Sequence, residues 1–280
     1  MRLLFKDQAA APEDPLPEYD SPPVIETSVG IQFDGLDQYT SLAAADFRKE
    51  IVATYPIVEE WPPLDPGFET FGASDSRIIN PQLTLITEAI RPRFFFVTRD
   101  GSELLQLQRD RLFFNWRRTE KGEAYPRYTH VRAQLKAGLE NLMHWASSFQ
   151  LGQVAPTQCE AVYVNRIPLA DGNGQACGLS FIFPWLTGLM GMTEDGNFRF
   201  RRRLHDEGGT PIARLSFDLQ YGTDHHGARE ARLMLAVRGR PADTSMDSCL
   251  AFIDAGREVI VRTFTEVTSK EAHQIWKRRR

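Results

Sequence analysis

Alternating apolar and polar positions predict β-strands over much of this chain. Residues 24–33 alternate over their whole length, as expected for a strand with one buried face. Residues 104–108 and 112–118 are two apolar runs separated by a short charged turn, so they are expected to pair as antiparallel strands. Asp100-Gly101 is a strong hairpin turn and predicts a further strand at residues 93–99.

Apolar residues recur at helical spacing in other segments. Residues 131–149 show the clearest helical pattern, and residues 246–264 predict a second long helix. Ser41 is the expected N-cap of a shorter helix that ends near residue 55. Its expected inward positions are Leu42, Phe47, Ile51 and Tyr55. Thr268 and Glu271 form a capping-box pattern that predicts a last short helix.

The second half of the chain loosely repeats the order of the first. Its expected strands are at residues 159–167, 179–183, 198–204, 212–221 and 229–237. Each half therefore has a strand, a connection, several strands and a long helix. Antiparallel sheets with one apolar face need a helical cover. The predicted fold is α+β: an internally duplicated antiparallel sheet covered by two long helices.

The expected organisation follows from this repeat. Residues 1–21 are proline-rich and acidic and predict a flexible leader. Residues 22–152 are the first α+β half and residues 153–280 the second, packed together as one unit. Within the first half, proline-rich residues 56–92 predict a long irregular excursion with a short strand at Leu83–Thr87.

Composition excludes several classes of protein. The chain has 280 residues, a net charge of −4 and 42% hydrophobic residues, so it is globular and not broadly basic. Its three cysteines fit neither a disulfide framework nor a zinc site. The longest apolar stretch, residues 179–192, is too short and too interrupted to span a bilayer. We therefore expect a cytoplasmic protein.

Several motifs carry a family resemblance. The most specific is the block Gln108-Arg-Asp-Arg-Leu-Phe-Phe-Asn-Trp-Arg117, with Gln106 before it, and a second is Tyr125-Pro-Arg-Tyr128. On these residues the chain resembles a sporadically distributed, uncharacterised bacterial protein family, from about Pro22 to Trp276. The resemblance implies no activity, cofactor or catalytic residue. Patchy occurrence in bacteria suits an accessory gene of a defence or toxin–antitoxin locus.

The sequence offers no persuasive catalytic group. It lacks a nucleophile elbow, a phosphate-binding loop and a dinucleotide fingerprint. His225-His226 is read as a solvated hairpin tip, although a metal pair with Asp224 is conceivable. Cys159 is read as a structural thiol, since a nucleophile would need a nearby histidine. We expect no catalytic residues, no metal and no cofactor.

Polar residues within the predicted strands are candidates for binding. They are Glu26, Asn115, Arg117, Glu160, Asn165 and Arg166. They could form buried pairs that align the halves, or simply point to solvent. Arg199, Arg201 and Arg203 alternate along one strand and would form a row suited to phosphates or to an acidic protein. The simpler alternative is an edge strand protected by charge.

Three hypotheses about function follow. The leading one is a non-enzymatic binding protein that presents a concave sheet or its arginine-rich rim to another protein, such as an operon-encoded toxin or effector. The second is nucleic-acid binding through Arg199, Arg201 and Arg203. The third is a small-molecule site or an enzyme in a sheet–helix cavity that uses Glu160, Tyr163 and Asn165.

Overall fold

The computed structural model describes residues 15–71, 91–187, 194–224 and 227–279. These residues form an α+β fold around one nine-stranded antiparallel sheet, which confirms the α+β class and the antiparallel sheet of the prediction. The strands are β1 (Val24–Phe33), β2 (Ile57–Trp61), β3 (Arg93–Val97), β4 (Glu103–Gln108), β5 (Arg111–Arg117), β6 (Pro156–Pro168), β7 (Gly196–His205), β8 (Pro211–Thr223) and β9 (Arg229–Gly239). The helices are α1 (Ser41–Ile51), α2 (Tyr128–Ser148), α3 (Leu179–Ile182), α4 (Met246–Val267) and α5 (Lys270–Ile275).

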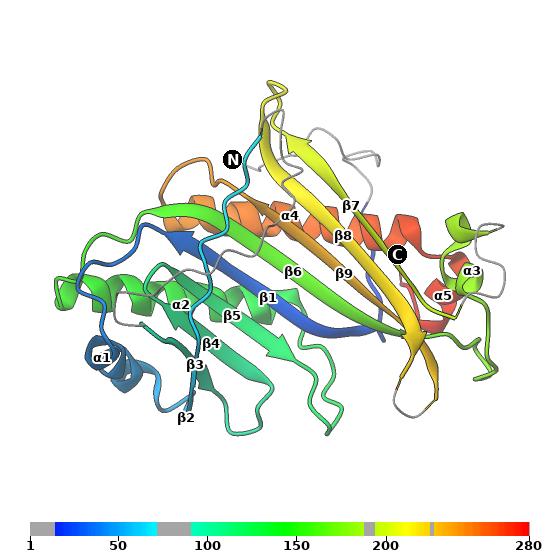
Figure 1. The fold of residues 1–280 in the computed structure, drawn as a ribbon, viewed down its shortest axis with the longest axis horizontal. Coiled ribbons are helices and arrows are strands. Elements are labelled where there is room, and N and C mark those ends of the chain that lie inside the picture. Colours follow the sequence, from blue (N-terminus) through cyan, green and yellow to red (C-terminus); the bar gives the residue numbers. More distant parts are fainter. Residues whose placement is uncertain (1–14, 72–90, 188–193, 225–226, 280) are drawn as a thin grey trace, which may run out of the picture.

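The sheet is antiparallel at every pairing between its strands. Their order is β2-β3-β4-β5-β1-β6-β9-β8-β7, so β1 and β6 pair at the middle. Strands from the first part of the chain lie on one side of this pair, and strands from the second part lie on the other (Figure 1). Successive side chains of a strand point to opposite faces. The alternation in the sequence therefore gives each of these strands one apolar face that can be buried.

Helices α2 and α4 lie on the same face of the sheet, behind the strands in Figure 1. Helix α2 contacts β5 and β1, and α4 contacts β6 and β9. The apolar face of β5 joins this core through Leu112, Phe114 and Trp116. Leu135 and Trp145 of α2 are fully buried. The hydrophobic core therefore lies between the sheet and these helices.

The opposite, open face of the sheet is crossed by residues 62–71, which we call the crossing segment. In Figure 1 it is the cyan coil that runs in front of the strands after β2. Side chains of β4, β1, β6 and β8 form hydrogen bonds to it in turn. An irregular segment that the sequence assigns only to a long excursion thus covers part of the open face.

Several local expectations are wrong. The strand expected at residues 179–183 is helix α3, because a short apolar run does not distinguish a strand from a buried helical turn. Leu42 is 78% exposed, while Phe47 is buried. The N-cap of α1 is Thr40, whose hydroxyl accepts a hydrogen bond from the backbone N–H of Ala43.

The last helix is also capped one residue later than expected. Its N-cap is Ser269, whose hydroxyl accepts from the backbone N–H of Ala272. The Thr268 hydroxyl instead donates to the carbonyl of Phe264, at the end of α4. The strand expected at Leu83–Thr87 lies outside the described residues.

Part of the expected flexible leader packs against the core. Tyr19 is 6% exposed and meets the rings of Phe264 and Trp276 edge-on, at centroid distances of 5.6 and 6.2 Å. The backbone N–H groups of Asp20 and Ser21 donate to carbonyls at the C-terminal end of α5. Proline and acidic composition does not reveal this anchor, because it depends on a single aromatic residue and on backbone hydrogen bonds to a distant part of the chain.

Candidate functional site

Glutamine side chains hold the backbone of the crossing segment. The Gln108 amide donates to the carbonyl of Leu64 at 2.8 Å and accepts from its N–H at 2.9 Å. The Gln32 amide makes the same two bonds to Gly67, at 2.8 and 3.0 Å. A primary amide carries a donor and an acceptor side by side. Each glutamine therefore recognises an extended backbone as a neighbouring strand would.

A further glutamine, Gln158, makes a weaker contact with the crossing segment. Gln158 pairs with Gln32 across β1 and β6, and its oxygen accepts from the N–H of Glu69 at 3.5 Å. Its Nε2 is buried and has no hydrogen-bond partner among the described residues. The fit of the crossing segment is therefore close over β4 and β1 and looser over β6.

Two buried arginines hold the carbonyls at either end of the crossing segment. Arg111 donates to the carbonyls of Leu64 and Asp65, at 3.3 and 2.9 Å. Arg214 donates to the carbonyl of Thr70 at 3.0 Å and forms an ion pair with Glu69. Arg111 and Arg214 are each 7% exposed, so these bonds are needed to compensate the loss of water.

A polar groove adjoins the end of the crossing segment, over β6, β9, β8 and β7. Its volume is about 550 Å³. Charged side chains dominate its lining: Glu69, Glu160, Arg199, Arg201, Arg214, Asp218 and Arg238. Most of these charges are paired. Arg238 lies 2.8 Å from Glu160, and Arg199 lies 2.5 Å from Asp218.

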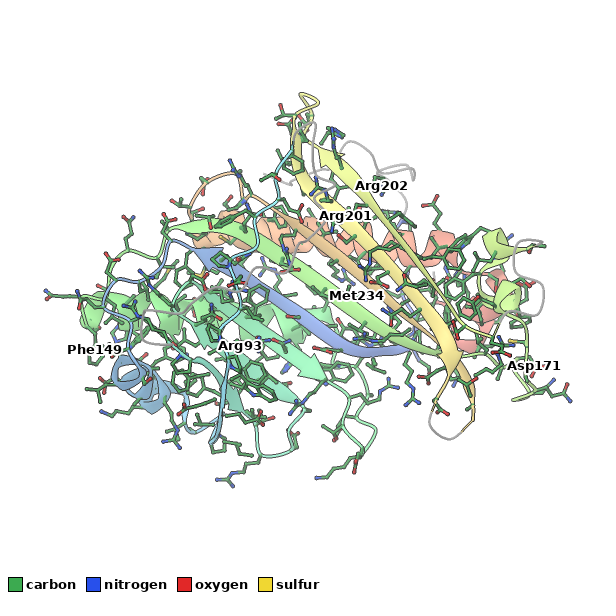
Figure 2. The ribbon with its side chains drawn as sticks, viewed as in Figure 1. Arg93, Phe149, Asp171, Arg201, Arg202 and Met234 are labelled. Atoms are coloured by element: carbon green, nitrogen blue, oxygen red, sulfur yellow. The ribbon has the colours of Figure 1, made fainter. Side chains whose placement is uncertain are left out.

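Arg201 is the exception in this lining. It is exposed on β7 and, among the described residues, takes part in no ion pair. Figure 2 labels it near one edge of the open face, far from Arg93 of β3. The four arginines and three carboxylates of the lining leave one net positive charge (4 − 3 = 1). The groove can therefore accept an acidic group without displacing an existing pair.

The structure brings only some of the predicted site residues together. Arg199, Arg201 and Glu160 line the groove, whereas Arg203 is exposed on β7 opposite Arg214 and is not part of the lining. Asn115 lies elsewhere on this face of the sheet. Its side-chain oxygen accepts from Gln106 at 2.7 Å.

The remaining predicted residues lie apart from the groove. Arg117 is exposed and donates to the carbonyl of Gly101 at 2.8 Å. Asn165 faces the helices and donates to the carbonyl of Leu233 at 3.3 Å. Glu160 is on the open face, so it does not meet Tyr163 and Asn165 in one cavity.

The charged strand residues Glu160 and Arg166 form ion pairs, but with residues outside the predicted set. Arg166 forms ion pairs with Glu230 and Asp224, and Glu160 with Arg238. These partners belong to β9 and to the turn before it, so they link β6 to later parts of the chain. Gln32 and Gln158 are not among the predicted site residues, because a polar side chain within a strand usually indicates a solvent-exposed face.

The described residues present little reactive chemistry. Burial raises the pKa of the Cys159 thiol well above its ordinary value, and so disfavours the nucleophilic thiolate. In the described part of the chain, no group of three or more His, Cys, Asp and Glu residues is placed to hold a metal ion. His225-His226 lies outside the described residues.

The described helices include none that is both long and apolar enough to cross a membrane. Comparisons with protein-family models, with curated proteins and with solved structures find no match to this chain.

Proposed function

We propose that this chain is a non-enzymatic binding protein whose open sheet face holds an extended segment of another protein. The observation that carries the proposal is the pairing of Gln32 and Gln108 with both polar groups of a backbone residue. Backbone hydrogen bonds of this kind provide affinity in strand-addition complexes, while adjacent pockets select side chains. The face is thus chemically suited to extended polypeptide.

The groove beside the crossing segment is the proposed place for the partner. It is lined by residues 68–70 of the crossing segment and by residues of β6, β9, β8 and β7, and Arg201 offers the partner an uncompensated charge. Phe68 of the crossing segment lines the groove, is 55% exposed and can contact an apolar side chain. The partner is therefore proposed to be an extended segment with acidic and apolar residues.

The setting of this activity is also a proposal. The family resemblance supports an accessory bacterial protein, such as an antitoxin-like component of a defence or toxin–antitoxin locus. In that setting the partner is a toxin or effector encoded by a neighbouring gene. Location in the cytoplasm belongs to the same proposal.

We further propose that the sheet consists of two duplicated halves, each covered by its own long helix. Strand order supports this, because β3-β4-β5-β1 is mirrored by β6-β9-β8-β7. The contacts of α2 with β1 and β5 correspond to those of α4 with β6 and β9.

Site-specific crosslinking in cells tests the proposed function. A photoreactive phenylalanine derivative at position 203, beside the groove on β7, should crosslink a discrete protein, and Arg201→Glu should weaken that crosslink through like-charge repulsion with an acidic partner. The same derivative at Lys136, exposed on α2 away from the groove, is the matched control. Equal products from both positions would contradict the proposal. A crosslink to nucleic acid that disappears with rising salt would instead favour nucleic-acid binding.

A further inference from the structure

A second cavity lies on the helix-covered side of the sheet. It has a volume of about 590 Å³ and is bounded by α2, α4 and the ends of β1 and β6. Small-molecule sites typically enclose about 300–1,000 Å³. The apolar part of its lining consists of Pro22, Val24, Ile260, Val261 and Phe264. This cavity is separated by the sheet from the groove on the open face.

The polar part of the lining contains most of the Tyr125-Pro-Arg-Tyr128 motif. Tyr125, Arg127 and Tyr128 all line the cavity, together with Tyr163 of β6. The hydroxyls of Tyr125 and Tyr163 lie 3.0 Å apart and form a hydrogen bond. Burial raises the pKa of both hydroxyls above 10.0, so each keeps its proton as a donor.

Arg257 of α4 supplies a positive charge beside these hydroxyls. Its guanidinium lies over the ring of Tyr128, 4.5 Å from the centroid, and its charge offsets part of the rise that burial causes in the pKa of Tyr163. Within the described residues it forms no ion pair. The nearby carboxylate of Asp254 is engaged elsewhere, by the Tyr128 hydroxyl at 2.5 Å and by Arg132 at 2.8 Å.

The other charges of the lining largely balance each other. Arg127 and Arg279 both form ion pairs with Asp20, which lies just outside the lining, and the lining itself contains the carboxylate of Glu18. The net positive charge of the site therefore comes from Arg257. Arg127 has a backbone φ of 76° and donates to the carbonyl of Tyr19 at 2.6 Å. A non-glycine residue is strained in that conformation, and such strain is concentrated at functional sites.

We propose that this cavity binds a small organic acid, with its carboxylate on Arg257 and its apolar body against Ile260, Val261 and Phe264. The planar guanidinium can donate two parallel hydrogen bonds to a carboxylate. The Tyr163 hydroxyl stands beside it as a neutral donor. An apolar body of aromatic or medium-chain aliphatic type fits these apolar side chains, which lie next to Arg257 along α4. This site is independent of the proposed protein-binding groove.

Calorimetric titration of the full chain with 2-naphthoate and decanoate tests the proposal. At least one carboxylate should bind saturably, and about tenfold or more tightly than its uncharged amide, because a hydrogen-bonded charge is lost in the amide. Arg257→Gln should weaken carboxylate binding about tenfold or more while leaving amide binding unchanged. Arg232→Gln, on β9 away from the cavity, is the matched control and should bind both probes as the unchanged chain does.

Two further measurements keep the test decisive if Arg257→Gln does not fold. Val261→Trp should fill the cavity and abolish binding of both carboxylates. In the unchanged chain, the Nε–H resonance of Arg257 should shift on titration with the bound carboxylate. The proposal is overturned if neither carboxylate saturates, if the amides bind equally well, or if that resonance does not move.

Discussion

Removal of one glutamine should release the crossing segment locally without unfolding the sheet. Gln32→Ala deletes the two hydrogen bonds to Gly67, of 2.8 and 3.0 Å. A neutral hydrogen bond contributes about 0.5–1.5 kcal/mol, so the pair stabilises the closed segment by about 2 kcal/mol. Since about 1.4 kcal/mol is a factor of ten, opening at Gly67 should become about 30-fold more frequent.

Hydrogen exchange resolved to single amides measures this opening. The Gly67 amide should exchange about 30-fold faster in Gln32→Ala when exchange is limited by the opening equilibrium. The amide of Leu64, held by Gln108, should change less. Gln106→Ala is the matched control, because Gln106 bonds Asn115 and Arg93 but not the crossing segment.

The result that would refute this reasoning is equally specific. If Gly67 exchanges at the same rate in Gln32→Ala as in the unchanged chain, the glutamine amide does not hold the segment. If Gln106→Ala accelerates Gly67 to the same extent, the effect comes from general loosening of the sheet. Either outcome would also remove the main support for binding of extended polypeptide on this face.

Three further predictions concern stability, each measured by urea denaturation. Leu42→Gln should change the unfolding free energy by less than about 0.5 kcal/mol, because Leu42 is exposed. Gly30→Ala should lower it by about 1–3 kcal/mol, because a Cβ there would overlap the backbone of Leu112 and the ring of Phe113. Burial lowers the pKa of His273 below 6.5, so the unfolded chain binds its proton first. Stability should therefore fall as pH drops below about 6.5, and His273→Asn should flatten that dependence.

Local patterns were enough to predict most elements of the fold. The period-two alternation of β1, β8 and β9 and the helical period of α2 and α4 identify these elements within a few residues. The same reasoning failed at α3, where four residues are too few to show a period. It also failed at Leu42, because a helix of modest amphipathicity has more than one plausible inward face.

Local sequence patterns predicted only part of the candidate sites. Alternation along β7 correctly suggested that Arg199 and Arg201 share a surface, and both line the groove. It could not identify their surroundings, because Asp218 reaches Arg199 only when β7 pairs with β8. The Tyr125-Pro-Arg-Tyr128 motif contributes to the family resemblance. Its place in a cavity beside Arg257 depends on how α2 and α4 pack.

The sequence by itself determined the fold class, most strand and helix positions, and the division of each strand into an apolar and a polar face. These properties depend on residues close together in the chain. Tertiary structure decided the strand order, the path of the crossing segment and the partners of the buried polar groups. Gln32 meets Gly67 across 35 positions, and Arg214 meets Thr70 across 144. Contacts over such separations leave no local periodic signal, because they arise only when the whole sheet has assembled.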